Sequence, residues 1–155
     1  MTPRLFIDAD ACPVKDEVYR VAARYGLHVF VVSNSWINTP REKWIEQVVV
    51  DAGPDIADDW IAERAGPGDI VITADIPLAA AVVEKDAHAL SPRGELYGRV
   101  NIRELLDLRN FMDTLRATGI DTGGPATFSS ADARAFANRL DTLLRRSMKT
   151  WTGKA

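Results

Sequence analysis

Acidic residues end two of the apolar segments in this chain. The segment RLFID (4–8) ends in Asp8, and IVITAD (70–75) ends in Asp75. Asp10 follows Asp8 by two positions, so on extended backbone both carboxylates would point to the same side. An acid directly after a buried apolar run needs a partner, because an uncompensated buried charge is costly. These three acids are therefore the first candidates for chemistry.

A second group of acids lies in DIADDWIAERA (55–65), which has helical spacing. Carboxylates that converge in one place repel each other unless a cation neutralises them. Hard divalent cations prefer oxygen ligands, and one cysteine and two histidines leave few softer ones. We therefore predict a Mg²⁺ or Mn²⁺ site. Its expected ligands are Asp8, Asp10, Asp55, Asp58 and Asp75, of which Asp8, Asp58 and Asp75 are the expected catalytic residues.

Several of these acids also have a purely structural interpretation. Asp58 and Asp59 could interact with the positive end of their own helix. Asp10 could cap the helix that is expected to start near Pro13. The sequence leaves these alternatives open.

Three polar residues near the same segments are candidates for binding the substrate. Thr73 precedes Asp75 by two positions and could orient it or a metal-bound water. Asn34 follows the apolar run LHVFVVS (27–33), and Arg93 in the segment SPRG could meet a phosphate. A strand hydroxyl or an exposed loop arginine would explain Thr73 or Arg93 equally well.

Strand-like and helix-like segments alternate along the chain. Strands are expected over 4–8, 27–33, 47–50, 70–75 and 87–91, and helices over 14–26, 55–65, 77–86, 101–119 and 131–149, with a short helix near 42–46 and a loop over 92–98. This order predicts an α/β fold with a mainly parallel central sheet and helices on both faces. Ligands of such sheets bind beyond the carboxyl ends of the strands. Asp8 and Asp75 should therefore share that edge.

Length and charge limit the possible classes of protein. A chain of 155 residues suits a single domain over 1–155. No apolar run approaches the roughly 20 residues that cross a bilayer, and acids interrupt the N-terminal run at once, so we expect a cytoplasmic protein without a membrane partner. From Arg134 onward, six basic residues stand against one acid, a net charge of +5. This segment could guide RNA past the acidic pocket, or it could be a solvated helix face.

Four segments resemble the YaiI/YqxD family of small bacterial proteins, and the resemblance covers essentially the whole chain. They are FIDADACPVK (6–15), DAGPDIADDWI (51–61), GDIVITADIPLAA (68–80) and LSPRGELY (90–97). That family is similar to the PIN-like superfamily, which includes metal-dependent ribonucleases. The resemblance implies a PIN-like three-layer sandwich with C-terminal helices. It also implies that Asp8 and Asp75 match the strand-end acids, whereas an Asp replaces the usual helix-borne Glu and leaves Asp55, Asp58 and Asp59 as alternatives.

Three functions remain open on the sequence. The first is a metal-dependent nuclease that acts on RNA. The second is a phosphatase resembling the haloacid dehalogenase group, because LFIDADAC holds an Asp-x-Asp pair and VFVVSN includes Ser33. That interpretation needs a further acid a few residues after Asp75, where Ala79 and Ala80 stand. The third is a non-catalytic module that binds RNA or another partner.

Overall fold

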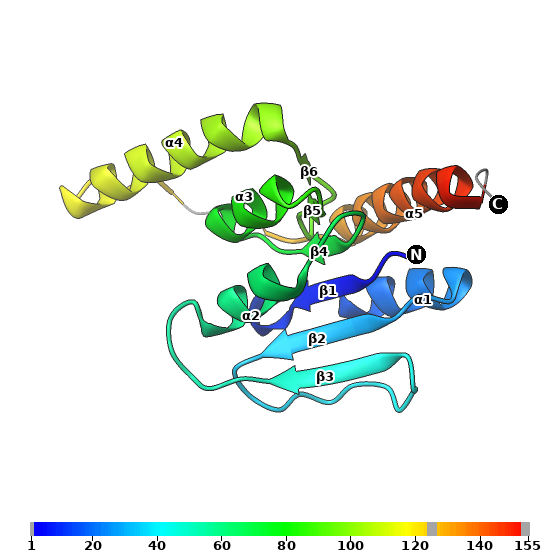
Figure 1. Cartoon of the computed structure of the whole chain (residues 1–155). Coiled ribbons are helices and arrows are strands. Elements are labelled where there is room, and N and C mark those ends of the chain that lie inside the picture. The colour runs from blue at the N-terminus through cyan, green and yellow to red at the C-terminus, as the bar shows by residue number, and fades with distance from the viewer. Residues whose placement is uncertain (1, 124–126, 153–155) are drawn as a thin grey trace.

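A six-stranded sheet in the order β3-β2-β1-β4-β5-β6 forms the centre of the molecule (Figure 1). The computed structural model describes residues 2–123 and 127–152. The first five strands are parallel, and β6 pairs with β5 in the antiparallel direction. The strands are β1 (Leu5–Asp8), β2 (Val29–Ser33), β3 (Ile45–Val49), β4 (Ile70–Ile72), β5 (His88–Leu90) and β6 (Leu96–Tyr97).

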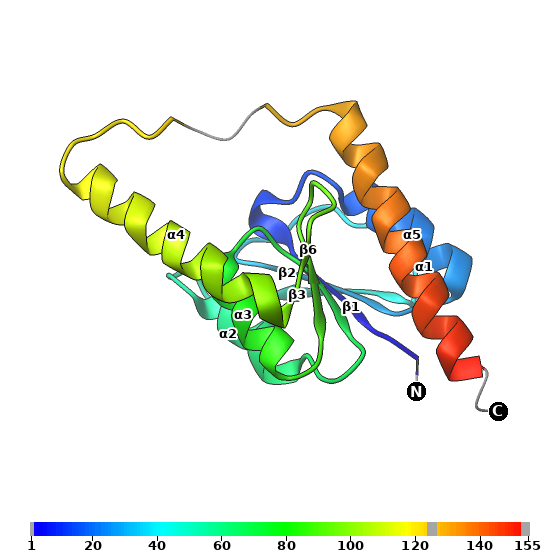
Figure 2. The ribbon, with the colours of Figure 1, turned by 90° about the horizontal axis from the view of Figure 1, so that it is seen from above.

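Helices cover both faces of this sheet, as the sequence predicts (Figure 2). They are α1 (Lys15–Tyr25), α2 (Ile56–Arg64), α3 (Ile76–Glu84), α4 (Arg99–Ala117) and α5 (Ser130–Thr152), and a 3-10 turn, η1 (Ala9–Ala11), follows β1. One face carries α1 and α5, and the other carries α2 and α3, with α4 packed on α3. The fold is therefore a three-layer α/β sandwich. Among the described residues, no helix has the length and apolar character needed to cross a membrane.

The central strand β1 divides the hydrophobic core into two halves. Leu5 and Ile7 are fully buried on the side of α1 and α5, where Phe136 fills the space between the layers. Phe6 points the other way and packs with residues of α2 and α3, including Ile61. Successive residues of a strand face opposite sides of the sheet, so a strand buried on both faces must be apolar throughout.

Asp8 lies at the carboxyl end of this apolar strand. At this point the order in which the chain adds strands to the sheet reverses direction. The chain passes from β1 to β2 and β3 on one side, and then returns to place β4 on the other side of β1. The carboxyl ends of β1 and β4 therefore flank a topological switch point, where α/β sheets bind ligands. The register pairs Ile7 with Ile72, which sets Asp8 beside Thr73. Asp8 and Asp75 lie at the same edge of the sheet, as expected.

The structure differs from the sequence-based elements at three places. The prediction of a short helix near 42–46 is wrong, because strand β3 begins at Ile45 and pairs with β2 along its whole length. Strand β4 ends at Ile72, and residues 73–75 turn into α3. The expected loop 92–98 contains the short strand β6, which completes a hairpin with β5. The β-branched run and the hairpin pairing outweigh the local helix and loop signals.

The hairpin between β5 and β6 allows a test of how tightly it packs on α5. Gly94 has a φ of +88°, and a Cβ there would lie 3.1 Å from the carbonyl carbon and oxygen of Ala135. Gly68 has a similar φ of +84°, but a Cβ there would meet no described atom within 4 Å. The Gly94→Ala variant should lose about 2–4 kcal/mol of unfolding free energy through strain and overpacking. The Gly68→Ala control should lose only about 1–2 kcal/mol from backbone strain. Equal losses in urea denaturation would contradict this close packing.

Candidate functional site

The hydroxyl of Thr73 joins the two strand ends that carry the central acids. Thr73 is 1% exposed, and its Oγ1 donates to Oδ2 of Asp8 at 2.8 Å. The same oxygen accepts from the backbone N–H of Asp75 at 3.0 Å. The Asp75 carboxylate in turn accepts from the N–H of Leu78 at 2.9 Å and so caps the start of α3. The hydroxyl of Thr73 therefore holds the side chain of Asp8 and the backbone of Asp75.

Asp58 approaches this pair from α2. Its pKa is raised from the ordinary value of 3.8 to about 7, first by burial and then by the nearby carboxylates of Asp75 and Asp8. Asp55 adds a smaller contribution and stands at the N-cap of α2 in the left-handed region, with a φ of 67°. Asp59 is exposed. Of the three acids that the sequence leaves as alternatives, Asp58 is the one whose charge interacts most strongly with the strand-end acids.

Asp8 experiences the same electrostatic environment. Its pKa is raised by burial, which outweighs the opposing hydrogen bond from Thr73, and by the carboxylates of Asp75 and Asp10. Three elements that are distant in sequence thus bring Asp8, Asp58 and Asp75 into one interacting group. A positive charge placed among them would stabilise the ionised forms of all three.

Asp10 occupies a different position from the one its spacing predicts. It lies in the 3-10 turn η1, so the expected extended Asp-x-Asp geometry is wrong. Its two carboxylate oxygens accept from the backbone N–H of Asn34 at 3.0 and 3.1 Å. The alternative role of Asp10, as the cap of α1, is not seen either, because Val14 is the N-cap residue. Asp10 therefore ties η1 to the end of β2, and Asn34 takes part through its backbone while its side chain is exposed.

A surface cavity of about 380 Å³ opens next to this group. Asp55, Asp58, Asp59 and Asp75 contribute to its wall, and Arg109 of α4 lies on the same wall. Arg109 also pairs with Asp113 at 3.5 Å. No pattern in the sequence distinguishes Arg109, because several arginines lie along this amphipathic helix and only packing shows which one faces the acids.

The predicted substrate-binding residue Arg93, and Ser33 of the phosphatase interpretation, both have structural partners. Arg93 forms a half-buried ion pair with Asp132 at 3.1 Å and lies 5.6 Å from the ring centre of Phe128, so it joins the β5–β6 hairpin to the start of α5. The hydroxyl of Ser33 donates to the backbone oxygen of Ser35 at 2.6 Å and is fully buried. A buried Ser33 hydroxyl is poorly placed to bind a phosphate, which weighs against the phosphatase interpretation.

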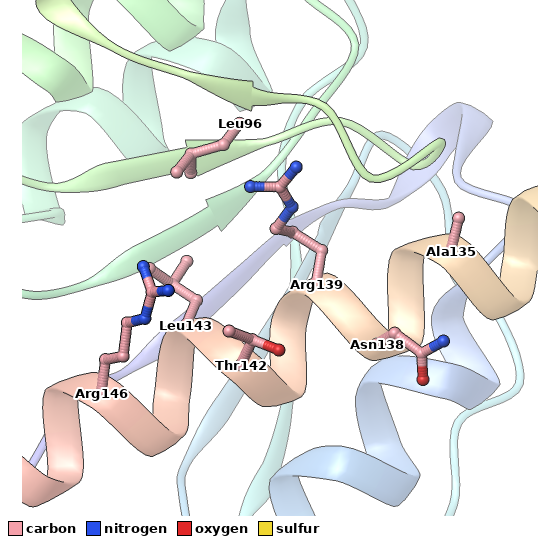
Figure 3. A pocket seen from close by; sticks show the side chains of 7 residues that line it. All are labelled: Leu96, Ala135, Asn138, Arg139, Thr142, Leu143 and Arg146. Atoms are coloured by element: carbon pink, nitrogen blue, oxygen red, sulfur yellow. The ribbon is translucent and has the colours of Figure 1, made fainter.

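The basic C-terminal helix lies on the opposite face of the sheet from α2 and α3. Its apolar stripe packs on α1. The prediction that this helix flanks the acidic pocket is therefore wrong. Figure 3 shows Arg139 and Arg146 extending from α5 toward Leu96 over a separate cavity of about 330 Å³. Arg145 bonds to Asp141 at 2.6 Å. Lys154 lies outside the described residues, and binding of RNA by this helix stays a prediction.

The donor atoms at the acidic group suit a hard divalent cation, because all of them are carboxylate oxygens. Hydrogen bonds hold one oxygen of Asp8 and one of Asp75, and both oxygens of Asp10 are occupied by Asn34. Within residues 2–123 and 127–152, no three acidic, histidine or cysteine side chains are already grouped as the ligands of one ion. Coordination of one cation by Asp8, Asp58 and Asp75 would therefore require rotation of side chains.

The raised pKa of Asp58 predicts how the stability of the metal-free protein depends on pH. Between the unfolded pKa near 3.8 and the folded pKa of about 7, the folded chain binds more protons at this site than the unfolded chain. Stability should therefore fall as the pH rises through this window and level off above it. Asp58→Asn should remove this contribution, so that in EDTA its Tm rises relative to wild type between about pH 5 and about pH 8. The exposed Asp59→Asn control should keep the wild-type slope, and parallel profiles for Asp58→Asn and wild type would contradict the assignment.

Comparison with known proteins identifies relatives over nearly the full length of the chain. Residues 6–146 match the family described as "Uncharacterized BCR, YaiI/YqxD family". The chain is 55% identical over 144 residues to a "UPF0178 protein" of Caulobacter vibrioides (strain NA1000 / CB15N), with 93% of this chain and 94% of the relative covered. It is 50% identical over 151 residues to a "UPF0178 protein" of Rhodopseudomonas palustris (strain BisB18), with 97% of each covered. The chain therefore belongs to the uncharacterised YaiI/YqxD family of bacterial proteins.

Proposed function

We propose that this protein is a divalent-metal-dependent nuclease that acts on RNA. The observation that carries the proposal is the convergence of Asp8, Asp58 and Asp75 from three elements. Burial, and then the carboxylates of Asp75 and Asp8, raise the pKa of Asp58 to about 7. Perturbed acids that converge at a topological switch point are typical of catalytic sites. The resemblance to PIN-like ribonucleases supports the same conclusion by analogy.

The side chains of Asp8, Asp58 and Asp75 would hold Mg²⁺ or Mn²⁺, with Asp10 and Asp55 adding negative charge at the margins. A bound ion of this kind activates water and stabilises the charge that develops on a phosphodiester. Thr73 would stay hydrogen-bonded to Asp8 while the side chains adjust around the ion, because its hydroxyl is buried and already bonded to that carboxylate. The N–H of Leu78 would hold Asp75 in the same way.

Arg109 is the residue best placed to contact a phosphate of the substrate. It lies on the wall of the 380 Å³ cavity beside the acids, and its guanidinium can form two parallel hydrogen bonds with phosphate oxygens. It takes the role that the sequence suggests for Arg93, which pairs with Asp132. The exposed side chain of Asn34 lies at the same edge and remains a candidate contact.

Replacement of Asp8 by Asn separates a catalytic role from a structural one. Asn keeps an oxygen that can accept from Thr73, while the loss of charge relieves repulsion with Asp75 and Asp10. Cleavage of RNA should fall by at least about a hundredfold, because the ion loses a charged ligand. The metal-free Tm should be unchanged or higher. Melting curves with and without Mn²⁺, beside an RNA-cleavage assay, measure both effects, and Mn²⁺ should raise the Tm of wild type more than that of the variant.

The exposed Asp59→Asn serves as the matched control and should retain cleavage and stabilisation by Mn²⁺. A metal-free Tm that drops by several degrees in Asp8→Asn would assign Asp8 a structural role instead. If Mn²⁺ stabilises neither protein and wild type cuts no RNA, the nuclease is excluded in favour of a non-catalytic binding module. Hydrolysis of a phosphate monoester without cleavage of RNA would favour the phosphatase.

A further inference from the structure

Trp36 is a large aromatic residue that the core does not use. It lies in the loop 34–44, which connects β2 to β3, and its exposed fraction is 72%. The neighbouring apolar residues of this loop behave differently, because Ile37 and Trp44 pack against the core on the side of α1 and α5. The indole of Trp36 therefore contributes little to the stability of the fold.

The backbone that carries Trp36 is nevertheless held firmly. The amide of Gln47 on β3 accepts from the N–H of Ile37 at 2.7 Å and donates to the oxygen of the same residue at 2.9 Å. On the other side, the buried hydroxyl of Ser33 bonds to the oxygen of Ser35. Both neighbours of Trp36 are thus fixed to the sheet. An exposed ring on a fixed backbone loses little conformational entropy when a flat ligand stacks on it.

The surroundings of Trp36 offer partners for a charged, polar ligand. It lines a cavity of about 460 Å³ together with the cations Arg41 and Lys43, the acid Glu42 and the polar side chains of Asn38 and Thr39. Arg41 and Lys43 are exposed, and no ion pair among residues 2–123 and 127–152 includes either of them. With Glu42 counted, these three charged residues keep a net charge of +1. An aromatic ring beside cations that form no ion pair is the combination by which proteins bind single-stranded nucleic acid.

The loop is also continuous with the acidic site. Figure 1 shows it leaving β2 at the carboxyl edge of the sheet and running back alongside β3. Its first residue, Asn34, donates its N–H to Asp10, and Trp36 follows two positions later. The loop therefore begins at the end of β2, the strand that neighbours β1 and Asp8 in the sheet.

We propose that the loop 34–44 is a binding site for single-stranded nucleic acid, in which one base stacks on Trp36 and the adjacent phosphates contact Arg41 and Lys43. The bound strand continues past Asn34 toward Asp8 and Asp75. This direction rests on the proposed nuclease function, whereas the stacking site itself does not. A single strand is required because a base must be unpaired before its face can stack on the indole.

The test is the binding of short oligonucleotides to the Asp8→Asn protein in EDTA, where cleavage does not interfere. Single-stranded RNA, single-stranded DNA and an RNA duplex of the same sequence should be compared, with tryptophan fluorescence and anisotropy as readouts. We expect single strands to quench the fluorescence and the duplex to bind more weakly. Adding Trp36→Ala should weaken single-strand binding by roughly 5- to 100-fold, and Trp36→Phe should restore most of it. Equal affinities for RNA and DNA would indicate recognition by stacking. A preference for RNA would indicate an additional hydrogen bond to the 2′-hydroxyl.

Phe111 serves as a matched control, because it is an exposed aromatic residue, 59% accessible, on α4. Phe111→Ala should bind oligonucleotides as the parent does. The double variant Arg41→Ala, Lys43→Ala should weaken binding, because two cations no longer neutralise phosphates. It should also flatten the dependence of log Kd on log salt by about 0.7 for each phosphate that the variant no longer neutralises.

The outcomes distinguish this proposal from the nuclease. Undiminished binding by Trp36→Ala, or no binding of any oligonucleotide, overturns the loop site even if wild type cleaves RNA. Binding that depends on Trp36 supports the loop site even if wild type shows no metal-dependent cleavage, in which case the nuclease fails alone. Equal affinity for the duplex and the single strand also overturns it, because a paired base cannot stack on Trp36.

Discussion

Repulsion among the carboxylates of Asp8, Asp58 and Asp75 is the constraint around which the carboxyl edge of the sheet is organised. Each acid comes from a different element, so the repulsion acts only once the fold is complete. Burial raises the pKa values of Asp8 and Asp58 most, and the neighbouring carboxylates, Asp75 foremost, raise them further. Two hydrogen bonds offset part of the cost, one from Thr73 to Asp8 and one from the N–H of Leu78 to Asp75. The positive end of α3 also favours the charge on Asp75. The remaining cost is what a bound cation would relieve.

The strand-end acids can be predicted from the sequence because two local signals are sufficient. Apolar runs that end in Asp8 and near Asp75 identify buried strands, and the parallel topology then places both acids at one edge. Spacing alone misplaces Asp10, because the chain turns immediately after Asp8 and the spacing does not show whether the backbone stays extended. The ion pair of Arg93 cannot be predicted from local sequence either, because its partner Asp132 lies 39 positions away.

Other features depend on packing that no short segment encodes. Asp58 rather than Asp59 faces the strand-end acids because α2 begins at Ile56 after the left-handed Asp55, which sets the rotation of the helix. Arg109 reaches the same cavity only because α4 packs across α3. The charge of the C-terminal helix can be counted in the sequence, but the apolar stripe that docks α5 on α1 decides which face of the sheet it covers.

The two proposed sites and the basic helix α5 occupy different surfaces of the fold. The acids lie at the switch point on the side of α2 and α3, the loop 34–44 begins at the neighbouring strand end, and α5 covers the opposite face. The central claim is that Asp8, Asp58 and Asp75 hold one divalent cation. Its most direct test is a crystal soaked in Mn²⁺ and measured for anomalous scattering at the manganese edge. We expect a peak at about 2–2.3 Å from carboxylate oxygens of Asp8 and of at least one of the other two acids. A saturating soak that leaves this position without a peak, while the side chains stay as described, would contradict the account.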